Sequence, residues 1–153
     1  MEEIAQFLYR EARLMDSHDY DGWFALWDEE LLYWVPCNDD DIDPKRSVSI
    51  IYDRRPQLEN RLFRLKGKHA FAQQPKSRLM RVVSNIEVER DDADGILVWS
   101  IFTLGDWRSD QQTVWFGRNR HLLRRTGDGL RMREKKVLLL NNDGAINNMT
   151  FLI

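Results

Sequence analysis

The stretch ILVWSIFTLGDW, residues 96–107, decides the fold because both of its alternating sets of positions are apolar. Successive side chains of a β-strand point to opposite faces of the sheet. A strand that is apolar on both faces is expected to be covered on both faces. One face would hold Val98, Phe102 and Leu104, and the other would hold Leu97, Trp99, Ile101 and Trp107.

Strand patterns continue on both sides of this stretch. Alternation over residues 80–89 predicts a half-buried strand, one face of which holds Met80, Val82, Ser84, Ile86 and Val88. Two further strands are expected at residues 113–123 and 130–140. Turn-forming Asp, Asn and Gly residues stand at 91–95, 126–129 and 141–144. The C-terminal half is therefore predicted to be a long antiparallel meander.

Helical periodicity dominates the N-terminal third. A three-four spacing of apolar residues over residues 4–15 predicts a first helix, with Glu11 on the same face. Asp19 is a suitable N-cap for a second, shorter helix. That helix would place Tyr20, Trp23, Phe24 and Trp27 on one side.

The segment before the meander mixes both periodicities. Residues 31–35 predict a strand that ends at Pro36, and residues 48–52 predict another short strand. Pro56 suits the first turn of a third helix. This helix would carry Leu58, Leu62 and Leu65, would end near Gly67, and would be followed by a short segment at 69–74.

Helices followed by a meander predict one α+β domain over residues 1–153, with the helices on the concave side of a curved sheet. The convex side would carry Trp99, Trp107 and Trp115. This is more apolar surface than a monomer usually exposes. We therefore expect an oligomer, with these three tryptophans at a subunit interface.

The charge balance narrows the classes of partner. The formal net charge is −2 and the pI is near 5.9, so nothing in the charge favours nucleic acid or an acidic membrane as a partner. The N-terminus does not resemble a secretory signal, and no window approaches the ~18 consecutive apolar residues of a membrane span. Cys37 is the only cysteine. The cytoplasm is the expected compartment.

Iron chemistry requires ligands that this sequence does not supply. A Rieske cluster needs two Cys and two His, and a mononuclear iron site needs two His and a carboxylate. The chain has one Cys, and its histidines His18, His69 and His121 show no ligand-like spacing. Cys37 has no assignable His and acid partners that would make it a nucleophile. We therefore predict no catalytic, cofactor-binding or metal-binding residue in this chain.

One enzymatic alternative stays open. Helices against a curved sheet can enclose a cavity, and small isomerases and dehydratases of this shape use a carboxyl group of raised pKa with Tyr or His donors. The candidates for such a site are Asp28, Tyr9, Tyr33 and Glu134. A ligand-binding or purely oligomeric module of the same shape is a third possibility.

Several segments, in order along the chain, resemble the small (β) subunits of bacterial aromatic-ring-hydroxylating dioxygenases. These segments are residues 4–14 with Asp16, residues 20–23, 26–27, 33–36 and 58–65, and Ser77-Arg78 followed by residues 83–86. The benzoate- and anthranilate-type branch is favoured by residues 135–141 with Ile146-Asn147, and by residues 43–46 ahead of 49–52.

The resemblance implies a cystatin-like, nuclear-transport-factor-2-like cone that works as a non-catalytic, structural subunit. It also implies a hexamer of three large and three small subunits, in which the small subunits form a trimer. A Rieske 2Fe–2S cluster and a mononuclear iron would lie in the large subunit. The substrate would be an aromatic ring, carboxylated or amino-substituted.

Overall fold

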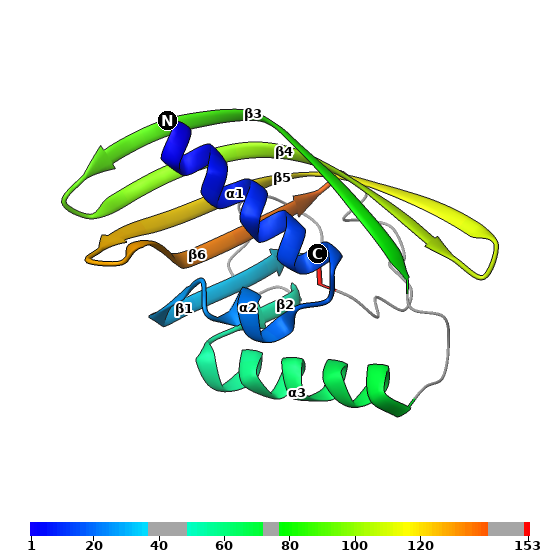
Figure 1. Cartoon of the computed structure of the whole chain (residues 1–153). Coiled ribbons are helices and arrows are strands. Elements are labelled where there is room, and N and C mark those ends of the chain that lie inside the picture. Colours follow the sequence, from blue (N-terminus) through cyan, green and yellow to red (C-terminus); the bar gives the residue numbers. More distant parts are fainter. Residues whose placement is uncertain (37–48, 72–76, 141–151) are drawn as a thin grey trace.

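A six-stranded sheet forms the frame of the computed structural model, which describes residues 1–36, 49–71, 77–140 and 152–153. Its strands lie in the order β2-β1-β6-β5-β4-β3, and every neighbouring pair is antiparallel except β1 with β6 (Figure 1). The strands are β1 Trp27–Pro36, β2 Ser49–Asp53, β3 Arg78–Asp92, β4 Gly95–Arg108, β5 Gln111–Thr126 and β6 Gly129–Leu139. The helices are α1 Glu2–Asp16, α2 Tyr20–Phe24 and α3 Arg55–Phe71. The predicted α+β architecture is confirmed.

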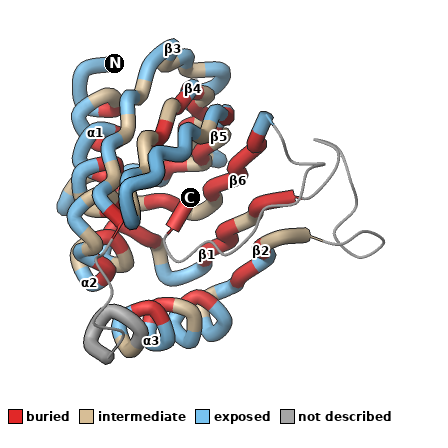
Figure 2. Tube along the Cα trace, turned by 90° about the vertical axis from the view of Figure 1, so that its right-hand side faces the viewer, coloured by how far each residue is buried: buried red, intermediate tan, exposed pale blue. Residues whose placement is uncertain are grey.

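Helix α1 lies across the inner, concave face of the curved sheet, while α3 lies beside β1 and β2 (Figure 1). The apolar side of α1 belongs to the same core cluster as the inward residues of β4, among them Val98, Phe102 and Leu104. Strand β6 is buried along most of its length (Figure 2). Each such apolar side chain contributes roughly 1.5–3 kcal/mol on burial. The space between α1 and the sheet is therefore the core of the protein.

The second predicted helix is correct in its start and wrong in its end. The Asp19 carboxylate accepts a hydrogen bond from Gly22 N at 2.9 Å, as expected of an N-cap. The helix ends at Phe24, and Trp27 opens β1 instead of completing the helix. Backbone pairing with β6 decides this, because Met132 N donates to Leu26 O at 2.8 Å and Trp27 pairs with Met132.

The third helix is longer than predicted. It continues through Gly67 to Phe71, so the predicted break near Gly67 is wrong. A glycine inside a helix costs only about 1 kcal/mol relative to alanine, which the rest of a 17-residue helix can absorb. The predicted short segment at 69–74 begins within this helix, and its residues 72–74 lie outside the described ones.

Strand β3 changes face in its middle. Asn85 has a φ of 53°, and the pairing with β4 slips between Ser84 and Glu87. This β-bulge reverses the alternation, since one extra residue shifts the following side chains to the other face. Ile86 and Val88 therefore pack against the core as predicted. Met80 and Val82, predicted on the same face, are 72% and 59% exposed on the outer face.

The three tryptophans predicted at an interface do not share one face. Residues paired across neighbouring strands project to the same side of a sheet. Trp115 pairs with Leu104 and packs against the core, so its predicted place on the convex side is wrong. Trp99 and Trp107 do lie on the outer face, opposite to Val98 and Leu104 in the alternation of β4.

Candidate functional site

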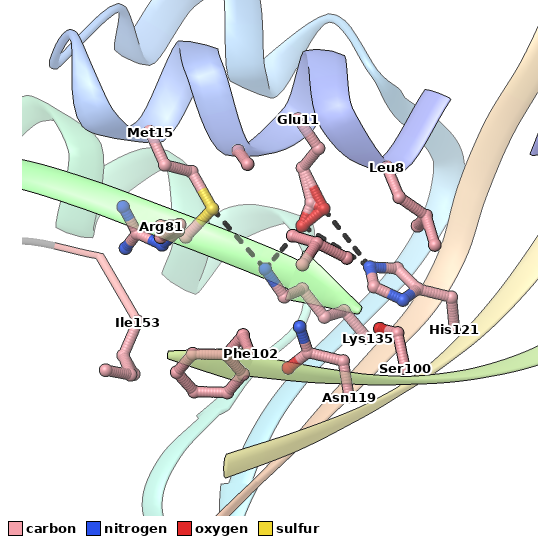
Figure 3. Close-up of a pocket in the computed structure, with 12 residues that line it drawn as sticks. Leu8, Glu11, Met15, Arg81, Ser100, Phe102, Asn119, His121, Lys135 and Ile153 are labelled. Atoms are coloured by element: carbon pink, nitrogen blue, oxygen red, sulfur yellow. Dashed lines mark hydrogen bonds and ion pairs between the residues drawn. The ribbon is translucent and has the colours of Figure 1, made fainter. Parts of the chain in front are cut away.

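A small cavity lies between α1 and the inner face of the sheet. Its volume open to the centre of a water molecule is about 20 Å³. Figure 3 shows α1 on one side of it and the side chains of β4, β5 and β6 on the other. The lining residues are Leu8, Glu11, Ala12, Met15, Arg81, Val83, Ser100, Phe102, Asn119, His121, Lys135 and Ile153.

Three ionisable side chains meet at this cavity, and all three are buried. Lys135 Nζ donates a hydrogen bond to Glu11 Oε1, and His121 Nε2 lies 3.1 Å from Glu11 Oε2 (Figure 3). Glu11 comes from α1, while His121 and Lys135 face each other across β5 and β6. We call these three residues the buried cluster. It joins the helix to the sheet through charged hydrogen bonds.

The electrostatics of the buried cluster keep the carboxylate ionised. Burial alone would raise the pKa of Glu11, but attraction by Lys135 and then by His121 outweighs it and lowers that pKa to about 2. Burial, together with the nearby positive charge of Arg81, lowers the pKa of Lys135 although Glu11 acts to raise it. The cluster is thus a buried ion pair, which is costly to break by removing one partner.

The C-terminal residues close the cavity near the end of α1. Arg81 reaches both segments, since its Nη1 lies 2.5 Å from Asp16 Oδ1 and its Nη2 donates to the Leu152 carbonyl. The Tyr33 hydroxyl donates to the Ile153 carbonyl and accepts from Ile153 N at 3.1 Å. Burial, the largest influence, raises the pKa of Tyr33 well above its usual value. Tyr33 therefore acts here as an anchor for the chain end.

The four residues of the predicted enzymatic alternative do not come together. Asp28 binds Arg124, with Oδ1 2.8 Å from Nη2, and this hydrogen bond lowers its pKa rather than raising it. Tyr9 is exposed, and Glu134 lies on the outer face opposite to Lys135. Only Tyr33 is near the cavity, at its closed end. The prediction of a shared site for these four residues is wrong.

The residues that do meet were not combined from the sequence. Glu11 stands out as a carboxylate on the apolar face of α1, and Lys135 as a cation on an inward strand position. Nothing in the sequence around His121 indicates a carboxylate partner. Of the other residues tested for metal or nucleophilic chemistry, His18 bonds the Ser77 carbonyl at 2.9 Å. Cys37 and the side chain of His69 lie outside the described residues.

The cavity offers little room for chemistry on an aromatic substrate. Ligand sites usually measure roughly 300–1,000 Å³, far above the volume of this one. Among the described residues, no group of three or more His, Cys, Asp or Glu side chains could hold a metal ion. In the same part of the chain, no helix is long and apolar enough to cross a membrane.

The sequence and fold of this chain are similar to those of known proteins. The family model described as "Ring hydroxylating beta subunit" matches residues 10–143. The chain belongs to this family. The small subunit of 2-halobenzoate 1,2-dioxygenase from Burkholderia cepacia is 33% identical over 92% of this chain and 88% of its own length. The β subunit of benzoate 1,2-dioxygenase from Acinetobacter baylyi is also 33% identical, over 93% and 87%.

Solved structures agree with the family. The β subunit of benzoate 1,2-dioxygenase from Burkholderia mallei has a TM-score of 0.84 and 29% identity, and the match covers 97% of this chain and 95% of that one. An NTF2-like protein with a cystatin-like fold from Novosphingobium aromaticivorans has a TM-score of 0.66 and 20% identity, over 95% and 83%. The cystatin-like fold and the expected benzoate-type kinship of this β subunit are confirmed.

Proposed function

We propose that this β subunit is a non-catalytic, structural component that holds large dioxygenase subunits in a hexamer of three large and three small chains. The outer face of its sheet would be the surface that other subunits cover. The Rieske cluster and the mononuclear iron would belong to the large subunit, because one Cys and three His in the whole chain cannot supply the ligands of both.

The observation that carries this proposal is an exposed apolar patch on the outer face. It consists of Met80, Val82, Ile101, Trp107, Val114 and Phe116, and we call it the outer patch. The register of β3, β4 and β5 places all six side chains on one face. The β4–β5 hairpin that carries Trp107 and Val114 projects beyond the other elements (Figure 1). Exposed apolar side chains gathered on one face of a sheet are typical of a protein interface.

The inner face of the sheet also supports a non-catalytic role for this chain. A catalytic carboxylate needs a pKa near the working pH and access to its substrate. Glu11 has a lowered pKa, and Lys135 and His121 already occupy its oxygens. This arrangement argues against a free-standing isomerase or dehydratase of this shape. On the outer face, Trp99 and Trp107 remain proposed interface residues.

The substrate class follows from the relatives alone. Those quoted above act on benzoate and 2-halobenzoate, as their names state. We assign to the complete enzyme an aromatic ring that bears a carboxylate, to which both atoms of O₂ are added. The cavity between α1 and the sheet is too small for that ring, so substrate recognition would lie in the large subunit.

A matched pair of variants tests the interface. Phe116 is 49% exposed in the outer patch, and Phe63 is 77% exposed on α3, outside the patch. Both Phe116→Glu and Phe63→Glu add one charge to an exposed position. Co-expression with the large subunit, followed by native mass spectrometry, should show loss of the hexamer for Phe116→Glu only. Equal assembly of both variants would contradict the proposed face.

A second experiment tests the non-catalytic role. The isolated β subunit is incubated with benzoate and 2-halobenzoate under air, with reductant and with the electron-transfer proteins of a benzoate dioxygenase. No product is expected, while the assembled enzyme should convert benzoate into its cis-dihydrodiol. Turnover by the isolated chain would overturn the structural role.

A further inference from the structure

Three polar atoms on the sheet side of the cavity lack a hydrogen-bond partner among the described residues. They are Ser100 Oγ, Asn119 Oδ1 and His121 Nδ1. Each of these residues is more than nine-tenths buried. A buried polar group without a partner costs about 1–3 kcal/mol, so native proteins satisfy such groups with protein atoms or ordered water.

The fold gathers these three atoms at one place. Ser100 pairs with Asn119 across β4 and β5, and His121 follows Asn119 by two residues on the same face. All three residues line the cavity. Figure 3 shows their side chains together on the sheet side of the cavity, across from Glu11. The three residues that carry the unsatisfied atoms therefore line the same cavity.

The hydrogen-bonding capacity of these atoms defines what fits between them. His121 Nε2 faces a carboxylate oxygen of Glu11, which only accepts hydrogen bonds, so Nε2 is the donor. A neutral ring that donates from Nε2 to Glu11 has an acceptor at Nδ1. Asn119 Oδ1 is also an acceptor, while the Ser100 hydroxyl both donates and accepts. The ligand must supply donors to two acceptors and accept from a hydroxyl.

Size and charge narrow the ligand further. A volume of about 20 Å³ holds one water molecule and excludes a larger organic molecule. A cation would be repelled by Lys135 and by Arg81, which also lines the cavity. An anion would face the Glu11 carboxylate and two acceptor atoms. A neutral molecule with two donors and two acceptors remains.

We propose that this cavity is a specific site for internal water, which donates to His121 Nδ1, bonds Ser100 Oγ and continues the network toward Asn119. The water fixes the ring of His121 in the form that donates from Nε2 to Glu11. It thereby connects the ion pair of α1 and β6 to β4 and β5.

Two measurements on the unmodified full chain test the site. A crystal structure of the chain, alone or with its large subunit, should show one water-sized density peak within hydrogen-bond distance of Ser100 Oγ and His121 Nδ1. Nitrogen-15 NMR should show His121 protonated at Nε2 and bare at Nδ1. Empty density, a peak larger than water, or a proton on Nδ1 would each overturn the proposal.

A matched pair of variants adds a third test. Ser100→Val removes the hydroxyl and fills the water position with a methyl group, whereas Ser84→Val makes the same change on the exposed part of β3. Ser100→Val should lose the density peak and shift the Nδ1 resonance of His121, while Ser84→Val changes neither. A retained peak in Ser100→Val would contradict the assignment. The measurements on the unmodified chain decide the question even where Ser100→Val does not fold.

Discussion

Glu11, His121 and Lys135 form the contact on which the position of α1 most depends. Glu11→Gln removes the negative charge and leaves the Lys135 ammonium buried without a counter-charge. The expected loss is about 3–5 kcal/mol in the free energy of unfolding, measured by urea denaturation. Glu87→Gln, an exposed position on β3, is the control and should change it by less than about 0.5 kcal/mol. Similar losses in both variants would show that the buried cluster contributes little.

Removing both charges gives a separate prediction at the same residues. The double variant Glu11→Leu, Lys135→Met leaves no unpaired buried charge, since leucine and methionine are apolar and of similar size to the originals. It should unfold at a higher urea concentration than Glu11→Gln. A double variant that is less stable than Glu11→Gln would mean that the hydrogen bond to His121, rather than the ion pair, dominates.

The pH dependence of stability follows from Glu11. Its pKa is about 2 in the folded protein and near 4.5 when unfolded, so the unfolded chain binds this proton first as the pH falls. The stabilisation is complete above pH 4.5 and is lost as the pH falls toward 2. A shift of this size corresponds to roughly 3 kcal/mol. Urea titrations at pH 5 and pH 2 should show a larger fall for the unmodified chain than for Glu11→Gln, and equal falls would contradict the lowered pKa.

At the scale of the element, Asn85 sets the face of every residue that precedes it in β3. Its φ of 53° lies in the left-handed region, which glycine adopts freely and β-branched residues adopt at a cost of roughly 1–2 kcal/mol. Asn85→Val should therefore lower the free energy of unfolding by about that amount, while Asn85→Gly should keep or raise it. Ser84→Val, an exposed neighbour, is the control. Denaturant midpoints compare the three variants.

The same bulge explains where prediction from sequence stops. Alternation correctly places Val98, Phe102 and Leu104 inside, because β4 runs without a slip against β5. The alternation gives the wrong face for Met80 and Val82, because the residues around Asn85 do not indicate that the φ of Asn85 is positive. The prediction is wrong for Trp115 because both alternating sets of positions in this strand are apolar. Alternation alone then cannot tell which set faces the core. The buried cluster cannot be predicted from the sequence because Glu11 lies over a hundred positions before His121 and Lys135 and meets them only through tertiary packing.

At the scale of the whole molecule, the inner and outer faces have different roles, and the difference can be measured. A partner that binds only the folded chain stabilises it by RT ln(1 + [partner]/Kd), or about 2.7 kcal/mol at a concentration one hundred times Kd. Hydrogen exchange of the most protected amides in β5 and β6 should therefore slow when the large subunit is added. This prediction rests on the proposed assembly.

Two variants separate the faces in that experiment. Phe116→Glu should keep the exchange rates of the isolated chain and lose the slowing by the large subunit, because its side chain lies in the outer patch. Glu11→Gln should exchange faster in isolation and still be slowed on assembly, because its defect lies inside. If Phe116→Glu instead destabilised the isolated chain, the outer patch would belong to the fold rather than to an interface. The two variants should behave in opposite ways if the inner face of the sheet stabilises the fold and the outer face binds other subunits.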